Sequence, residues 1–164
     1  MNDSSNSTTT TKVKNLGKKF EDVVYKQFSA YPGVSIDRIP DQTMRYKGRT
    51  NVSDFILFKY PREYYIECKT VHGNRLPFAK ITQFDALMGK VGILGVVPGV
   101  LCWWVDKDIT RWIPIDEIAY LKSNGYKSVR YDDAAGFVIA GRKKKIFFEY
   151  YIKSFFDYFD NYDY

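Results

Sequence analysis

Residues 52–69 read VSDFILFKYPREYYIECK, and they decide the predicted fold. Apolar residues dominate both halves of this stretch, and the KYPR segment between them is typical of a tight turn. The pattern predicts two antiparallel strands, VSDFILF and EYYIECK, joined as a hairpin. If the turn is centred between Tyr60 and Pro61, opposed residue numbers sum to 121, and Asp54 faces Glu67.

Two carboxylates and one ammonium group fall on one face of this predicted hairpin. Side chains alternate along a strand, so Glu67 and Lys69 point to the same side and Cys68 to the other. Opposed side chains have Cβ atoms about 4.5–5.5 Å apart, and two carboxylates at that distance repel each other unless a cation lies between them. Asp54 and Glu67 therefore form a candidate site for a hard cation such as Mg²⁺.

Such a site would suit phosphodiester hydrolysis. A bound Mg²⁺ polarises a phosphate and lowers the pKa of a bound water, and Lys69 could orient the attacking water or stabilise charge in the transition state. The alternative interpretation is a solvated hairpin face with an ordinary salt bridge. The apolar runs ILF and YYI favour a buried hairpin, in which unpaired carboxylates are costly, and thus favour the functional interpretation.

The rest of the sequence predicts an α/β fold with a mixed central β-sheet flanked by α-helices. Residues 1–13 are expected to be a flexible Ser/Thr-rich tail, and residues 14–164 a single domain. Asn15 is expected to cap a first helix. The other expected elements, in chain order, are strand 34–39, a basic loop to residue 51, the hairpin, helix 78–90, strands 93–97, 100–105 and 112–115, helix 117–123, strand 137–139 and an aromatic final segment.

Composition restricts the class of protein further. Of the 164 residues, 45% are hydrophobic and 18% aromatic, which excludes general disorder. No apolar run approaches the ~20 residues of a membrane span, and the start MNDSSNSTTT does not resemble a signal peptide, so we expect a cytoplasmic protein. Cys68 and Cys102 are expected to be reduced core residues. The formal charge of +6 indicates a polyanionic partner.

The order of these elements resembles the PD-(D/E)XK nuclease core, also called the restriction-endonuclease-like fold. GKKFE lies in the first helix, SD in the second strand, IECK in the third, and a helix with a glutamine follows. LPFAKITQFDALMGKVGILGVV, WIPIDEIAYL, YKSVRYDD and GRKKKIFFEYYIKSF resemble successive segments of RecU-type Holliday-junction resolvases. The resemblance covers about residues 14–156, and Asp54, Glu67 and Lys69 form its specific motif.

The resemblance implies a role for each matching residue. Asp54 and Glu67 would bind Mg²⁺, with Mn²⁺ able to substitute, and Lys69 would be catalytic. Glu21 would complete the metal site through a metal-bound water, and Gln83 would lie nearby as a supporting or DNA-contacting group. The implied activity is paired cleavage of a branched, four-way DNA junction. Because two opposed cuts need two active sites, a two-fold homodimer is also implied.

One feature departs from the family. RecU-type proteins carry a long basic stalk before the metal-binding aspartate, whereas this chain has only residues 40–53 there. A short loop of this kind would suit a compact viral relative acting in a bacterial cell. Its cations Arg45, Lys47 and Arg49 are predicted phosphate contacts. Further candidate contacts to the DNA backbone are Lys18, Lys19, Arg75, Lys80 and Arg142–Lys145.

The remaining motifs have simpler interpretations. His72 is the single histidine of the chain, which excludes His-based metal sites and Ser-His-Asp chemistry; we place it in a loop beside the DNA. Trp103, Trp104 and Trp112 fall in strand-like runs and are interpreted as core or dimer packing.

Three alternatives remain at this point. The chain could be another PD-(D/E)XK nuclease of restriction or repair type, or a DNA-binding module of the same fold without activity. An RNA-binding domain has little support, because no aromatic-glycine recognition motif is present.

Overall fold

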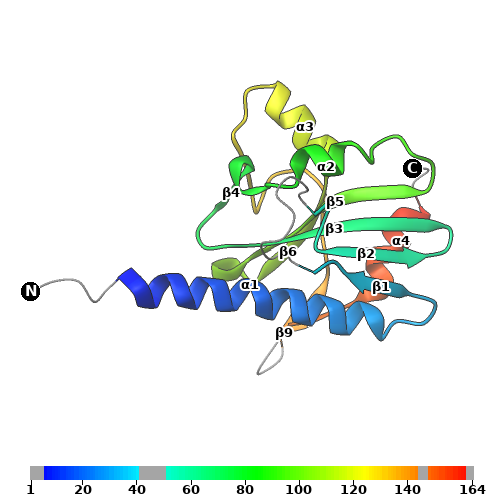
Figure 1. The fold of residues 1–164 in the computed structure, drawn as a ribbon, viewed down its shortest axis with the longest axis horizontal. Helices are drawn as coiled ribbons and strands as arrows, with labels where there is room; N and C mark the ends of the chain where they lie inside the picture. The colour runs from blue at the N-terminus through cyan, green and yellow to red at the C-terminus, as the bar shows by residue number, and fades with distance from the viewer. Residues whose placement is uncertain (1–5, 41–50, 144–147, 162–164) are drawn as a thin grey trace, which may run out of the picture.

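The computed structural model describes residues 6–40, 51–143 and 148–161. At its centre lies a mixed six-stranded sheet in the order β1-β2-β3-β5-β6-β8, with helices on both faces (Figure 1). The β3–β5 pair is parallel, and the other neighbouring pairs are antiparallel. The predicted mixed central sheet flanked by helices is thus confirmed.

The elements have the following bounds. The central sheet contains β1 (Ser35–Arg38), β2 (Phe55–Lys59), β3 (Arg62–Val71), β5 (Val96–Trp104), β6 (Ile109–Pro114) and β8 (Phe137–Val138). Two small sheets pair β4 (Arg75–Pro77) with β7 (Ser128–Arg130) and β9 (Gly141–Lys143) with β10 (Phe148–Tyr150). The helices are α1 (Asn6–Ser29), α2 (Phe84–Met88), α3 (Ile115–Ser123) and α4 (Ile152–Asp160), with 3-10 turns η1 (Phe78–Lys80) and η2 (Val105–Lys107).

The predicted hairpin register is confirmed. Phe55 pairs with Ile66 and Lys59 with Arg62, so opposed residue numbers sum to 121. Strand β3 also pairs with β5 along its other edge, from Glu63 to Val71. It is therefore a central strand whose side chains alternate between the two faces of the sheet.

An aromatic layer covers one face of the sheet. Helix α1 contributes Phe20, Val24 and Phe28, and α4 contributes Phe155 and Phe159, all of them buried. The rings of Phe28 and Phe155 meet edge to face with centroids 5.1 Å apart. Because burying one such side chain contributes about 1.5–3 kcal/mol, these residues hold both helices on the sheet.

A second core lies on the opposite face, under α2, α3 and the small β4–β7 sheet. Its fully buried members include Leu76 in β4, Leu87 in α2, Ile118 in α3 and Val129 in β7. Strand β3 contributes Tyr65 and Val71 to this side, whereas Tyr64, Ile66 and Cys68 of the same strand belong to the aromatic layer. The sheet is thus covered on both faces, which explains the long apolar runs in its central strands.

The first helix differs from the prediction. Helix α1 begins at Asn6, so Asn15 lies inside it and is not its N-cap. Between these residues the chain contains no glycine or proline that would end a helix. In Figure 1 the first turns of α1 extend past the edge of the sheet.

The predicted helix 78–90 is also wrong in its extent. Only η1 and the five-residue α2 form, separated at Ile81 to Gln83. The backbone N–H of Phe78 donates to Lys127 O at 2.9 Å, which ties the start of this segment to β7, and the backbone leaves the helical conformation at Ile81. The helical spacing of Ile81 and Leu87 places both in the core without a continuous helix.

The two strands expected at 93–97 and 100–105 are one strand, β5. The expected break lay at Pro98 and Gly99, because proline is disfavoured inside sheets. Pairing of β5 with β6 begins only at Gly99, so Pro98 lies just outside that ladder. A residue without an N–H is tolerated there.

Several smaller expectations agree with the structure. Cys68 and Cys102 are free and buried. Trp104 and Trp112 are fully buried and Trp103 packs against the core, as predicted for core tryptophans. None of the helices in the described ranges has both the length and the apolar character needed to cross a membrane.

Gly99 provides a test of this packing. A Cβ at this position would collide with the indole of Trp112 and come within 2.8 Å of Ile113 O. We expect Gly99→Ala to lower the free energy of unfolding by about 1–3 kcal/mol through overpacking, measured by urea denaturation. As a control, Gly89 has an α-helical φ of −63°, and its Cβ would meet no atom closer than 3.4 Å. Equal stability of the two alanine variants would contradict the described contact.

Candidate active site

Asp54 directly precedes β2 and is held by backbone bonds on both sides. Its N–H donates to Ile66 O at 3.1 Å, and its carbonyl accepts from Ile39 N at 2.8 Å. The side chain reaches across to β3, where Oδ2 accepts a hydrogen bond from the backbone N–H of Cys68 at 2.7 Å. Asp54 thus continues the hairpin register by one residue, and its carboxylate lies beside the backbone of the Glu67 strand.

Glu67 is one of the few buried charged residues in the described part of the chain. Its side chain is 1% exposed, and Oε1 accepts a hydrogen bond from Lys69 Nζ at 2.5 Å. The other oxygen, Oε2, is buried and accepts no hydrogen bond from the described residues. Lys69 is 21% exposed, so the ammonium group connects the buried carboxylate to the surface.

The surroundings of Glu67 disfavour its ionised form. Burial is the largest cause and the charge of Asp54 the next, and together they raise the pKa of Glu67 from 4.5 to about 7. Lys69 acts in the opposite direction through its charge and hydrogen bond. The two carboxylates therefore interact as the sequence predicted, although the lysine neutralises only part of their repulsion.

Glu21 approaches the same site from α1. The helix crosses β3 near Gly17, where a Cβ would lie 3.8 Å from Thr70 Oγ1. One turn further along α1, the charge of Glu21 raises the pKa of Glu67 and of the Cys68 thiol. Across residues 6–40, 51–143 and 148–161, however, no three His, Cys, Asp or Glu side chains are grouped closely enough to hold one metal ion. A direct third ligand is therefore not assembled, and the role of Glu21 stays a prediction.

Gln83 is not joined to this acidic pair by a hydrogen bond. It lies at the N-cap of α2, and its Oε1 accepts from Thr82 Oγ1 at 2.6 Å. Its predicted role beside the metal site stays a prediction.

Lys80 lies on the same side of the sheet as Lys69. Burial raises the pKa of the Cys102 thiol, and the positive charges of both lysines oppose that rise. Cys102 pairs with Lys69 across the β3–β5 ladder. The charges of Lys69 and Lys80 therefore both act on the interior next to Cys102.

Some of the other predicted DNA contacts are exposed, and the rest lie outside the described residues. Lys18, Lys19 and Arg75 are exposed, on α1 and on β4. Arg45, Lys47 and Arg49 lie outside the described residues, as do the side chains of residues 142–145.

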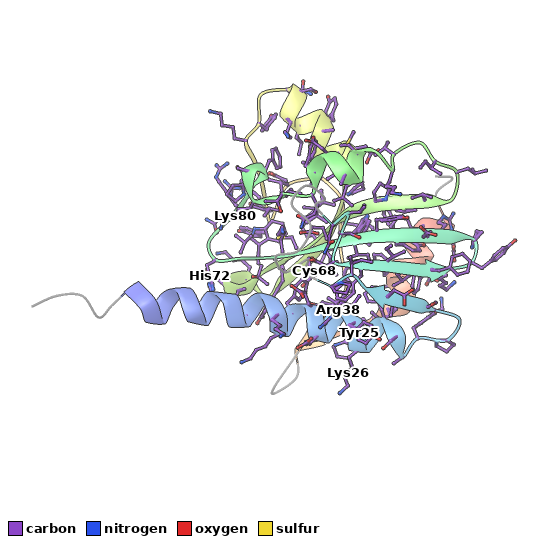
Figure 2. All side chains as sticks on the ribbon, in the orientation of Figure 1. Tyr25, Lys26, Arg38, Cys68, His72 and Lys80 are labelled. Carbon is purple, nitrogen blue, oxygen red and sulfur yellow. The ribbon has the colours of Figure 1, made fainter. Side chains whose placement is uncertain are left out.

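His72 lies in an exposed loop, as expected. Its Nδ1 is 2.9 Å from Asp106 Oδ1, and the N–H of Gly73 donates to Asp106 Oδ2 at 2.6 Å. Asp106 therefore ties the end of β3 to η2. Figure 2 shows His72 and Lys80 toward the same end of the molecule, away from Cys68.

Sequence reasoning missed the contacts that support the site. The backbone N–H of Cys68 orients Asp54, and the buried Ser53 hydroxyl donates to Phe55 O at 2.8 Å, fixing the chain next to it. No side-chain pattern could reveal a backbone donor. The burial of Ser53, by contrast, follows from the alternation of Ser53, Phe55 and Leu57 along one strand face.

The residues present fit a hard divalent cation. The donors are carboxylate oxygens, which Mg²⁺ and Mn²⁺ prefer. Glu67 Oε2 has no partner within the described chain, and the raised pKa of Glu67 reflects repulsion that a cation would relieve. Asp54 and Glu67 would hold such an ion, which would supply Lewis-acid stabilisation of negative charge on a phosphate.

Comparisons with known proteins give a limited result. No family model matches the sequence, and no curated protein matches it. Among solved structures, the chain is similar to Hjc, a Holliday junction resolvase from the archaeal hyperthermophile Archaeoglobus fulgidus, with a TM-score of 0.48 and 15% sequence identity, over 61% of this chain and 78% of that chain. Any assignment of function therefore rests on the residues of this chain.

The raised pKa of Glu67 predicts how stability depends on pH without metal. A carboxyl whose pKa is higher in the folded state favours folding most at low pH, and this contribution is lost as pH rises from 4.5 to about 7. Relative to Glu67→Gln, the wild type should lose up to roughly 3 kcal/mol of stability between pH 5 and pH 8 in EDTA, measured by urea unfolding. A constant difference between the two proteins would contradict the raised pKa.

Metal binding provides a second test of the acidic pair. Mg²⁺ or Mn²⁺ should raise the unfolding temperature of the wild type at pH 8, because a ligand at a hundredfold its Kd adds about 2.7 kcal/mol of stability. Asp54→Asn should abolish this shift, whereas Glu63→Gln, on the same face of β3, should retain it. An equal shift in all three proteins would place the metal elsewhere.

Proposed function

We propose that this protein is a divalent-metal-dependent DNA endonuclease that resolves four-way (Holliday) junctions by paired phosphodiester hydrolysis. The observation that carries the proposal is the buried Glu67 carboxylate, with one oxygen bound by Lys69 and the other without a partner among the described residues. A purely structural ion pair would satisfy both oxygens, because an unmet buried acceptor costs about 1–3 kcal/mol or more. Perturbed carboxylates of this kind are typical of functional sites.

Each side chain has a distinct role in the proposed reaction. Asp54 and Glu67 bind the cation, and the Cys68 N–H keeps Asp54 oriented toward β3. Lys69 is partly exposed, so its ammonium group can orient an attacking water and stabilise the charge that develops on the phosphate. The negative charge of Glu21 acts on Glu67, and this added charge strengthens the affinity of Asp54 and Glu67 for a cation.

Selectivity for a junction is the finer part of the proposal. It is supported by the resemblance of residues 14–156 to RecU-type resolvases, over the single domain proposed for residues 14–164. Two opposed cuts would be made by a two-fold homodimer with one active site in each protomer.

The first experiment compares a labelled four-way junction with matched linear duplex, in Mg²⁺ or EDTA. We expect paired, symmetric nicks on the junction in Mg²⁺ alone. Asp54→Asn should lower the rate by at least about a hundredfold, since even residues that only support a metal ligand contribute about 10–100-fold. Glu63→Gln should cut at the wild-type rate.

Each other outcome points to a different protein. Equal cutting of junction and duplex would indicate a restriction-type or repair-type nuclease of the same fold. Tight DNA binding without cutting in Mg²⁺ or Mn²⁺ would indicate an inactive DNA-binding module.

A further inference from the structure

The small β4–β7 sheet joins two segments that are far apart in the sequence. Arg75 pairs with Arg130, and Pro77 with Ser128. Leu76 and Val129 are fully buried in the second core. Because side chains alternate, their neighbours in β4 and β7 face outward. The pairing thus presents an outer face built from both segments.

Three exposed cations lie in or next to this small sheet: Arg75 in β4, Lys80 at the end of η1, and Lys127 just before β7. None of them forms an ion pair with another described residue, and Arg75 makes one long hydrogen bond, to Ser128 Oγ at 3.4 Å. We call Arg75, Lys80 and Lys127 the corner cations.

Arg130 differs from the corner cations. Its guanidinium makes two hydrogen bonds to the carboxylate of Asp132, at 2.8 and 3.0 Å, and its N–H donates to Asp133. The chain therefore neutralises one arginine of this small sheet and leaves the opposed Arg75 available for another anion.

The elements that carry the corner cations follow β3 closely in the chain or pair with the segment that does. Three residues separate the end of β3 from the start of β4, and β3 carries Glu67 and Lys69. The charges of Lys69 and Lys80 both act on Cys102. Figure 1 shows β4 beside the end of the sheet at which β3 ends. A DNA arm bound by the corner cations would therefore lie at the end of the sheet where β3 ends.

We propose that the outer face of β4 and β7, with η1, binds the sugar-phosphate backbone of one duplex arm of the substrate. This inference rests on the proposed function in naming that arm as part of the DNA that is cut. Lys127 lies beside Phe78, the residue that follows β4. Phe78 is three residues from Arg75, a separation of about 10 Å for extended chain. One DNA strand presents about three phosphates over that length.

Such contacts hold the DNA without reading its bases. Arginine and lysine bind phosphate oxygens regardless of sequence, and they fix the register and orientation of the duplex. The corner cations would therefore hold a duplex arm whatever its base sequence.

The test measures DNA binding rather than cleavage. Fluorescence anisotropy of a labelled four-way junction in EDTA gives the Kd between 50 and 200 mM salt. The test variant carries Arg75→Gln, Lys80→Gln and Lys127→Gln. The control variant carries Lys26→Gln, Lys59→Gln and Lys153→Gln, which also removes three positive charges but on the α1 and α4 side of the sheet.

The expected result is a change in the salt dependence. Each lost phosphate contact lowers the slope of log K against log salt by about 0.9, so the test variant should lose between about 2 and 3 units of slope. The control should keep the wild-type slope. Lys127→Gln alone should lose about 1 unit, and this exposed single change avoids any folding defect of the triple variant.

Failure of this inference is separable from failure of the proposed function. If the test and control variants bind alike, or if the wild type does not bind DNA, the inference is overturned. Suppose that the slope falls only in the test variant but the wild type never cuts DNA in Mg²⁺. The proposed DNA contact of β4, β7 and η1 is then supported, and the proposed endonuclease activity is wrong. Binding of RNA duplex with the same slope change would keep the phosphate contacts but remove the assignment to DNA.

Discussion

The pairing of β3 with both β2 and β5 constrains everything else in this structure. Strand β3 is covered on both faces, so each of its side chains must suit one of two different cores. A slip of one residue would move Glu67 into the aromatic layer and Cys68 into the acidic site. The register that places Phe55 opposite Ile66 also places Asp54 beside the Glu67 strand, and the candidate site follows directly from it.

One face of the sheet mainly stabilises the fold, and the other face carries the candidate active site. The face under α1 and α4 is a dense aromatic layer, in which the ring of Phe155 contacts those of Phe28 and Tyr64. The opposite face holds mostly aliphatic residues, with Tyr65, Phe78 and Trp104 among them, together with the acidic pair. Burying Glu67 beside Asp54 opposes folding in the absence of a cation, and the aromatic layer supplies the apolar burial that offsets this cost.

Charge is distributed unevenly around this site. Asp54 is half-buried and Glu67 is buried, whereas Lys69 is partly exposed and Lys80, Arg75 and Lys127 are fully on the surface. A polyanion approaching the sheet would meet unpaired cations before it meets the carboxylates. This arrangement reconciles an acidic centre with a chain of formal charge +6.

Local pattern in the sequence determined the hairpin, its register, the shared face of Glu67 and Lys69, and the burial of Cys68, Trp104 and Trp112. These features depend on the alternation of side chains and on the solvent preference of each residue type, which neighbouring residues reveal. Sequence reasoning placed the first helix nine residues too late, split β5 at Pro98, and joined η1 to α2. The bounds of these three elements depend on contacts with segments distant in the chain, which local pattern does not reveal.

Only the tertiary structure decided which groups surround the acidic pair. The Cys68 N–H binds Asp54, the crossing of α1 brings Glu21 near the acidic pair, and the β4–β7 pairing brings Lys127 beside Phe78. All three depend on contacts between distant segments. The sequence by itself determined the chemistry of the candidate site, because residue types and strand alternation are local. The fold determined its electrostatics, because burial and distance between side chains exist only after the segments have packed.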